Sequence, residues 1–276
     1  MRLFQRRLLG CVVAAVTAVG FVGVGASAAA ANPISSFTCA GGSIPAGTYS
    51  SLVINGACVV DSGNVSVTNN VAVLNGKELI AAFGSADGST SKLIVGGNVA
   101  VGANAVLVLG CEPGAFKCLN DPDTNENDPG TFAAADSIGG SVSATNALAV
   151  LVHNSTIRQN LALIGGGGGV NCNSQAALQG SPAYATFEDT HIGGNLSIVG
   201  WRSCWLGTFR THVVGNVTFN NNMTADPDGN ELADNTITGN FSCSGNSPTP
   251  WFGDSQGGPN HVVGNVSGQC TSIVGT

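Results

Sequence analysis

Charged residues are scarce in this sequence of 276 residues: they make up 9% of it, against about 25% in an average soluble domain. Such residues normally cover the exposed faces of helices, so their scarcity argues against a helical bundle or a coiled coil. Aromatic residues are also few, at 6%, but hydrophobic residues reach 43% and there are 40 glycines. That hydrophobic content is enough for a core and argues against disorder. The composition indicates a folded protein with little helix.

Residues 1–31 have the organisation of a secretory signal peptide. Three arginines within the first seven residues precede an uncharged apolar run over 8–24, and small residues fill 26–31. We expect cleavage near 28–31, with the Arg6–Arg7 pair leaving the export route open. The apolar run could span a bilayer, but no basic stop-transfer segment follows it. The sequence therefore predicts an extracellular protein with no stable membrane insertion after cleavage.

Removal of the signal peptide would change the charge and the cysteine count. Six basic and sixteen acidic residues would remain, a net charge of −10, which argues against nucleic acid as a partner. Eight cysteines would also remain, and an even number in an exported chain indicates disulfides. No C-x-x-C motif is present, which weakens zinc-binding and redox interpretations. Eight cysteines allow 105 connectivities, and we expect nearest-neighbour pairs: Cys39 with Cys58, Cys111 with Cys118, Cys172 with Cys204, and Cys243 with Cys270.

A short phrase recurs eight times along the chain. Glycine precedes the central residue in seven copies, apolar residues recur at positions −3, +1 and +3, and position +2 is always Ser, Thr or Ala. This alternation is typical of a strand with one buried face, and Gly-Asn favours a tight bend. The central residues are Asn64, Asn98, Ser141, Asn160, Asn195, Asn216, Asn240 and Asn265.

Centres late in the chain lie 19 to 25 residues apart, too close for a helical crossover but suitable for one coil of a solenoid. We therefore predict an all-β fold: one right-handed parallel β-helix domain over 32–276, with loops inserted near 111–131 and 165–190. Coils should stack at about 4.8 Å, so the central asparagines should form a hydrogen-bonded column. We expect the glycine run 165–169 to be a flexible loop, because no phosphate-binding motif follows it.

The repeat also predicts which polar residues stack in neighbouring coils. Asp189, Arg210 and Asp234 share position −6, while His191 and His212 share position −4. Both positions have the parity opposite to the buried −3 position, so we expect these five side chains on one outward face. The patch could be a ligand groove, its paired imidazoles could hold a metal ion, or its charges could be exposed ion pairs of little energetic value.

Two acidic loops have oxygen ligands at alternate positions, as calcium sites do. They are Asp226, Asp228 and Asn230, and the segment 121–127. Neither has a glutamate at the twelfth position, so plain turns are the alternative. Trp201 and Trp205 could stack on sugar rings or pack a loop beside Cys204. We therefore expect no cofactor, with calcium as the alternative.

Several stretches resemble an uncharacterised family of exported actinobacterial proteins. The resemblance spans nearly all of the mature chain and implies secretion and a β-helix, with no catalytic residues. The stretches are CAGGSIPAGTYSSLVINGAC (39–58), VLVLGCEP (106–113), VLVHNSTI (150–157), GGGGGVNC (165–172), VGWRSCWLG (199–207), FNNNMTADPDGNE (219–231), CSGNSPTP (243–250) and GQC (268–270).

The expected architecture also resembles that of pectate lyases, polygalacturonases and bactofilins. The sequence lacks the G-H-G, R-I-K and G-D-D motifs of the enzymes, while bactofilins lack a signal peptide and disulfides. We therefore expect a secreted, non-catalytic protein of the cell envelope or extracellular space that is structural or binds a cell-wall or extracellular glycan. A polysaccharide lyase or glycoside hydrolase is the alternative.

Overall fold

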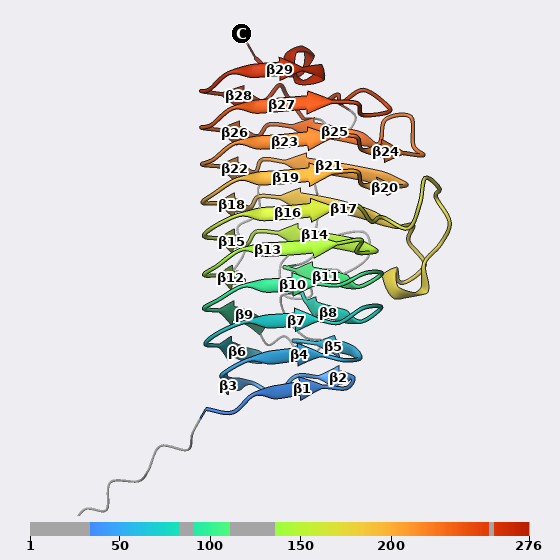
Figure 1. Cartoon of the computed structure of the whole chain (residues 1–276). Helices are drawn as coiled ribbons and strands as arrows, with labels where there is room; N and C mark the ends of the chain where they lie inside the picture. Colours follow the sequence, from blue (N-terminus) through green and yellow to red (C-terminus); the bar gives the residue numbers. More distant parts are fainter. Residues whose placement is uncertain (1–33, 83–90, 111–135, 254–256, 276) are drawn as a thin grey trace, which may run out of the picture. The chain divides into compact units, whose positions relative to one another are not determined.

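The computed structural model describes residues 34–82, 91–110, 136–253 and 257–275. Strands in these residues form three large sheets, here called sheets A, B and C, in which every pairing is parallel (Figure 1). Through most of the fold the chain visits sheets A, B and C in turn, so each coil contributes one strand to each sheet. This arrangement is a parallel β-helix, and it confirms the predicted fold.

Sheet A is the longest of the three. Its ten strands, in spatial order, are β1 (Phe37–Cys39), β4 (Leu52–Ile54), β7 (Val71–Val73), β10 (Val99–Val101), β13 (Val142–Thr145), β16 (Leu161–Ile164), β19 (Leu196–Val199), β23 (Val217–Asn220), β27 (Phe241–Ser244) and β29 (Val266–Gly268).

Sheets B and C complete each coil. Sheet B contains β2 (Gly42–Ser43), β5 (Ala57–Val59), β8 (Glu78–Ala81), β11 (Val106–Leu109), β14 (Ala149–His153), β17 (Tyr184–Glu188), β21 (Trp205–Phe209) and β25 (Asn230–Ala233). Sheet C contains β3 (Gly47–Tyr49), β6 (Gly63–Val67), β9 (Ser91–Val95), β12 (Ser137–Ile138), β15 (Thr156–Ile157), β18 (His191–Ile192), β22 (His212–Val213), β26 (Thr236–Ile237) and β28 (His261–Val262).

Four smaller elements complete the described part of the chain. Two short strands pair outside the main sheets, β20 (Arg202–Ser203) and β24 (Met223–Thr224). The helices among the described residues are two 3-10 turns, η1 (Ala176–Leu178) and η2 (Gln269–Ser272).

The core follows from the alternation in the repeat. In β16, for example, Leu161 and Leu163 are fully buried while Ala162 between them faces outward. The same apolar positions of successive coils lie opposite one another, so Leu161 stacks between Val142 and Leu196. One continuous hydrophobic core therefore runs the length of the stack.

The asparagine column lies at the bend between sheets C and A. The Asn195 backbone N–H donates to Oδ1 of Asn160 at 2.9 Å, and Oδ1 of Asn195 accepts from the Asn216 N–H at 2.8 Å. Asn98, Asn240 and Asn265 occupy the same position in their coils. From Asn98 to Asn240, the amide oxygen of each column asparagine thus accepts a backbone N–H that the bend leaves without a strand partner.

The assignment of Asn64 to this column was wrong. Asn64 lies inside β6 of sheet C, where it pairs with Lys92. The column residue of that coil is Asn70, whose Oδ1 accepts the Asn98 N–H at 2.8 Å. Gly-Asn followed by an alternating Val-Ser-Val fits the bend of the repeat, but it also fits the continuous strand that Asn64 occupies.

Two further ladders, both buried, were missed by the sequence analysis. At the corner between sheets B and C, Oδ1 of Asn235 accepts the Thr211 N–H at 3.0 Å, and Oδ1 of Asn260 accepts the Asn235 N–H at 3.1 Å. In the segment that follows sheet A, Oδ1 of Asn222 accepts the Trp201 N–H at 2.9 Å. At the corners of the coils, backbone N–H groups therefore donate hydrogen bonds to buried side chains in the interior as well as to exposed side chains on the surface.

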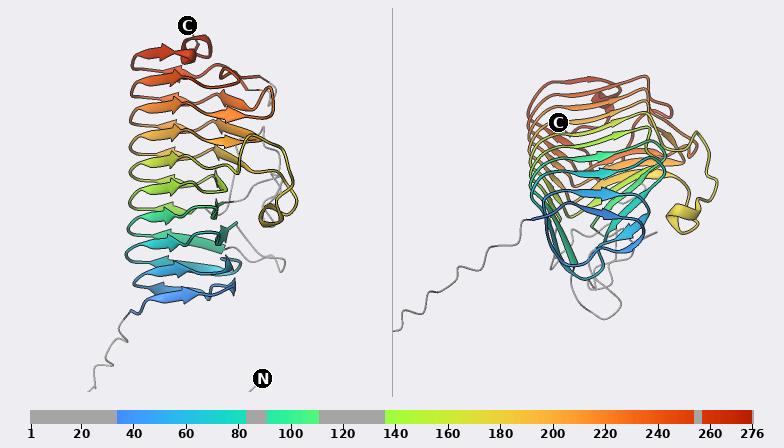
Figure 2. Two further views of the ribbon diagram at one scale, coloured as in Figure 1. Left: turned by 45° about the vertical axis from the view of Figure 1, so that its right-hand side comes forward. Right: turned by 60° about the horizontal axis from the view of Figure 1, so that its bottom comes forward.

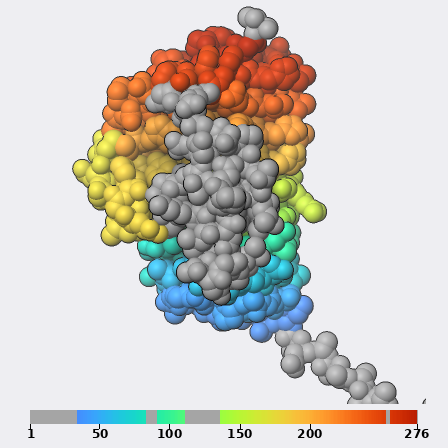
Figure 3. All heavy atoms as spheres, turned by 180° about the vertical axis from the view of Figure 1, so that it is seen from behind, coloured from blue at the N-terminus to red at the C-terminus, as the bar shows by residue number. Residues whose placement is uncertain are grey.

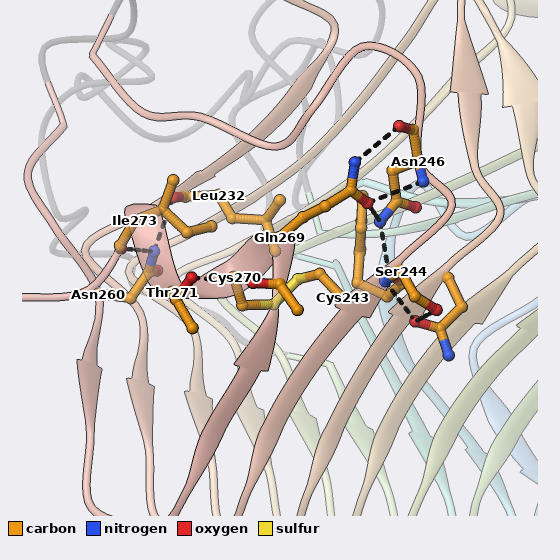
Figure 4. The surroundings of a disulfide bond; sticks show 12 residues. Leu232, Cys243, Ser244, Asn246, Asn260, Gln269, Cys270, Thr271 and Ile273 are labelled. Atoms are coloured by element: carbon orange, nitrogen blue, oxygen red, sulfur yellow. Dashed lines mark hydrogen bonds between the residues drawn. A yellow bond between two sulfur atoms is a disulfide. The ribbon is translucent and has the colours of Figure 1, made fainter.

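Three of the four expected disulfides lie in the described residues, and all three have the predicted pairing. Cys39–Cys58 joins the first two coils, Cys172–Cys204 ties down an inserted segment, and Cys243–Cys270 joins β27 to η2. Figure 4 shows the last of these beside Gln269, whose Oε1 accepts the Asn246 N–H at 2.9 Å. The predicted Cys111–Cys118 pair lies outside the described residues.

The inserted segment 165–183, drawn in yellow, projects from one side of the stack (Figures 2 and 3). The five consecutive glycines at its start, 165–169, all have positive φ. The Gly167 N–H donates to the Ala147 carbonyl at 2.8 Å and the Gly169 N–H to the Arg202 carbonyl at 3.0 Å. The expectation of a flexible loop is therefore corrected: the run is hydrogen-bonded against the coils, and glycine is needed because a Cβ at Gly167 would collide with the Arg202 carbonyl.

Candidate functional site

The predicted charged column lies where sheet B turns into sheet C. Asp189, Arg210 and Asp234 directly follow β17, β21 and β25, and all three have a left-handed backbone, with φ of 46°, 47° and 55°. Aspartate tolerates this conformation because its short side chain can bond locally, whereas arginine has no such advantage. A shared backbone geometry therefore stacks these residues at one corner.

Arg210 and Asp189 form a bidentate ion pair between adjacent coils. The guanidinium donates from Nε to Oδ1 of Asp189 and from Nη2 to Oδ2, each at 2.8 Å. The same Oδ2 lies 3.0 Å from Nε2 of His153, a buried residue at the end of β14. Burial by itself would raise the pKa of Asp189, but the hydrogen bonds from His153 and Arg210 outweigh it, so this pKa is lowered.

Glu188 completes the cluster from the last position of β17. Its side chain is buried, and its Oε1 accepts a hydrogen bond from the Thr186 hydroxyl at 2.7 Å. Its Oε2 lies 3.6 Å from Nη2 of Arg210 and has no hydrogen-bond partner. Burial raises the pKa of Glu188, while the charges of His153 and Arg210 oppose that rise.

The cluster of His153, Glu188, Asp189 and Arg210 combines two carboxyl groups with a guanidinium and an imidazole. Ligand atoms of the first three lie within 4.8 Å of one another, close enough to hold a metal ion. However, Arg210 already occupies both oxygens of Asp189. Its guanidinium supplies the positive charge that an ion would bring, so the cluster has the features of a buried ion-pair network.

The sequence analysis missed His153 and Glu188. Both occupy position −7 of the repeat, one residue before the column that contains Asp189. Their strands place them opposite each other in register. A comparison of the coils at position −7 as well as at −6 would have shown that His153 and Glu188 stack in neighbouring coils.

The structure divides the predicted patch. Position −5, between the two columns, turns inward at the corner, where Thr190 and Thr211 are buried. His191 and His212 lie beyond that corner on sheet C, where both side chains are exposed. The alternation continues through the corner, but the expected single outward face is corrected: Asp189 and Arg210 lie at the ends of sheet B strands and pack against the buried Glu188 and His153, while the histidines lie on sheet C.

Asp234 and the histidine pair have separate partners. Oδ2 of Asp234 accepts the Gly258 N–H at 2.9 Å. The Nδ1 atoms of His191 and His212 lie 3.2 Å apart, with their rings edge to face. Charged and imidazole groups of the predicted patch thus form two distinct sites.

The proposed calcium ligands lie in a turn that closes on itself. Oδ1 of Asp226 accepts the Asp228 N–H at 3.1 Å, and Asp228 is exposed. Asn230 is buried at the start of β25, and its amide donates to the Pro248 carbonyl at 2.7 Å. These contacts are those of an Asx-turn, and calcium binding here stays a prediction. The second acidic loop, 121–127, lies outside the described residues.

The two tryptophans of 201–205 have different surroundings. Trp201 is fully buried, and its indole N–H donates to the Ser203 hydroxyl at 2.9 Å. Trp205 is half-buried and its ring stacks on Phe209 with centroids 5.5 Å apart. The packing interpretation is confirmed for Trp201.

A larger feature is the outer face of sheet A. Its ten strands contain no Asp, Glu, Lys, Arg or His. One column of outward side chains crosses all ten strands in register. It consists of Thr38, Val53, Ala72, Ala100, Ser143, Ala162, Ser197, Thr218, Ser242 and Ser267.

In the part of the chain that the structure describes, no helix has the length and apolarity needed to cross a membrane. Comparisons with protein-family models, with curated proteins and with solved structures found no match to this chain.

Proposed function

We propose that this chain is an exported, non-catalytic β-helix that acts as a rigid binding or structural element against an extended surface, such as a cell-wall or extracellular glycan. The observation that carries the proposal is the uncharged outer face of sheet A. Side chains on it repeat with each coil, at about 4.8 Å. A regular array of small groups complements a flat, repetitive partner better than a single small molecule.

The chemistry of this face suits a neutral glycan. Serine, threonine and asparagine can exchange hydrogen bonds with sugar hydroxyls, and the alanines can contact the apolar faces of sugar rings. Docking would desolvate no charge, which is the most costly part of burying a polar surface. The resemblance of 39–58 and the other stretches to exported proteins and the disulfides fit an oxidising compartment, where such glycans occur.

The arrangement of the charged cluster supports the non-catalytic proposal. A glycosidase needs two carboxylates that can reach the scissile bond. Glu188 and Asp189 converge, but Asp189 is held by both Arg210 and His153, and Glu188 is buried. The lyase or hydrolase alternative would require this network to open.

Co-sedimentation of the oxidised mature chain with insoluble glycans tests the proposal. Peptidoglycan, chitin and cellulose would each serve as the solid phase. We expect the wild type to bind at least one of them and the Ser197→Lys/Thr218→Lys variant to lose that binding, because two lysines would break the uncharged face.

A matched control carries the same added charge on another face. Thr156→Lys/Thr236→Lys alters two positions of sheet C and should bind like the wild type. Equal loss in both variants, or no binding to any of the glycans, would contradict a role for sheet A. Release of reducing ends or unsaturated sugars from these polymers would favour the enzyme alternative.

A further inference from the structure

We propose that His191 and His212 form a surface site for a divalent transition-metal ion such as zinc. The two residues begin β18 and β22, which are adjacent in sheet C, and they lie opposite each other in register. Both side chains are exposed, and their Nδ1 atoms are 3.2 Å apart.

The separation of the two nitrogens matches that of two ligands on one ion. Zinc binds imidazole nitrogen at about 2.0–2.1 Å with tetrahedral angles, which places two such nitrogens about 3.3 Å apart. The ring centroids lie 4.9 Å apart with planes inclined at 66°. Small rotations of the exposed rings would therefore direct both lone pairs at one ion without moving the backbone.

The backbone under the pair is held in place. The His191 N–H donates to the Ser155 carbonyl and the His212 N–H to the Thr190 carbonyl, both at 2.9 Å. The two ligands therefore start from a fixed spacing, and little ordering entropy opposes binding.

Two imidazoles leave coordination positions open. Structural zinc sites use four protein ligands, whereas an ion held by fewer keeps water or accepts a ligand from another molecule. Imidazole also suits copper and nickel, so the site should select transition metals over calcium and magnesium, which prefer oxygen ligands. The expected site is an exchangeable one on the outside of the coil stack.

The chain contains its own control residue. His261 begins β28 and belongs to the same column, but Thr236 on β26 separates it from His212. Two strand spacings amount to about 9.6 Å, twice the backbone spacing of His191 and His212. His261 is thus an imidazole in the same setting without a histidine neighbour.

Calorimetric titration of the oxidised mature chain with zinc chloride tests the site. We expect one zinc ion per chain in the wild type. Because loss of an outer-shell partner alone costs roughly tenfold in metal affinity, His191→Ala and His212→Ala should each weaken binding by at least about tenfold. His261→Ala should bind zinc like the wild type.

A gain-of-binding variant tests the register independently. Thr236→His would place four histidines on consecutive strands, so we expect two zinc ions per chain. NMR shifts of the histidine ring nitrogens should identify His191 and His212 as the wild-type ligands.

Three outcomes would overturn the proposal: a wild type that takes up no zinc, affinity unchanged in His191→Ala and His212→Ala, or equal loss in His261→Ala. Asp226→Ala/Asp228→Ala should retain zinc, which separates this site from the acidic turn. Ser197→Lys/Thr218→Lys should also retain it, so the metal site and the sheet A proposal can fail independently.

Discussion

The guanidinium of Arg210 holds both carboxylate oxygens of Asp189, although the two residues belong to different coils and lie 21 positions apart. Their side chains are 17% and 10% exposed, so the ion pair is largely shielded from water. Shielding makes the loss of one partner costly, because the other charge is left buried. The pair therefore ties β17 to β21 at the corner between sheets B and C.

Replacement of Arg210 by alanine should destabilise the protein by about 3 kcal/mol, within the range for breaking a buried ion pair. The change would leave Asp189 with His153 as its ion-pair partner and would remove the guanidinium that lies 3.6 Å from Oε2 of Glu188. Urea unfolding followed by circular dichroism would measure the loss. Arg158→Ala, at an exposed position, should change stability little; an equal effect of the two substitutions would argue against a special role for the corner pair.

The inner and outer asparagine ladders should differ in their contribution to stability. Asn235→Ala would remove the acceptor of the Thr211 N–H and the donor to the Thr208 carbonyl, both buried, and should cost about 2–4 kcal/mol in unfolding free energy. Asn195→Ala would expose the Asn216 N–H to water and should cost about 1 kcal/mol. Thermal or urea unfolding of both variants would test the ranking, which a larger loss for Asn195→Ala would refute.

Loss of the Cys39–Cys58 disulfide should loosen the first coils. This bond closes a loop with a sequence separation of 19, for which the chain-entropy model gives about 3 kcal/mol. In Cys39→Ala/Cys58→Ala, amide exchange should accelerate first in β1 to β5. Exchange in the last coils should stay slow, since Cys243–Cys270 is intact there; uniform acceleration along the chain would contradict the expected local fraying.

Asp136 should make stability depend on pH. It is buried, and desolvation raises its pKa from 3.8 to about 7, although its carboxylate accepts the Leu93 and Gly110 N–H groups. The folded state thus retains a proton that the unfolded chain loses near pH 4. The contribution of Asp136 is therefore greatest at low pH and is lost as the pH rises toward 7.

Asp136→Asn isolates this effect from the other titrating groups. The unfolding free energy of the wild type relative to that of Asp136→Asn should fall between about pH 4 and pH 7, by a few kcal/mol at about 1.4 kcal/mol per pKa unit. Urea titrations across this range would measure the difference. A constant or rising difference would show that the buried carboxyl does not retain its proton.

Much of the fold was predictable because each coil repeats the same short sequence pattern. Alternating apolar and small residues around Gly-Asn, as at Asn195 and Asn216, indicate a strand, a bend and a strand, and their spacing indicates one coil. Asn64 shows the limit of that method. It satisfies the local pattern, but the column contains Asn70, because the pairing of β6 with β9 decides which residue reaches the bend.

The contacts within the candidate sites were less predictable from the sequence than the fold, because they depend on the tertiary structure. Sequence register correctly placed His191 opposite His212, since neighbouring strands pair at equal positions. It could not show that Asp189 and Arg210 would contact His153 and Glu188, because these contacts join the ends of strands from different coils. His153 and Glu188 were missed because they lie at position −7, one residue outside the positions that were compared.

The sequence by itself determined the coil, its apolar interior and the disulfide pairs in the described residues, because these depend on short-range spacing and on residues that repeat. The tertiary structure decided which polar groups meet. Arg210 lies against Asp189 and Glu188, and Asp189 also contacts His153, because adjacent coils bring the ends of three sheet B strands together. The histidine pair was separated from them because one buried residue per coil turns the chain from sheet B into sheet C.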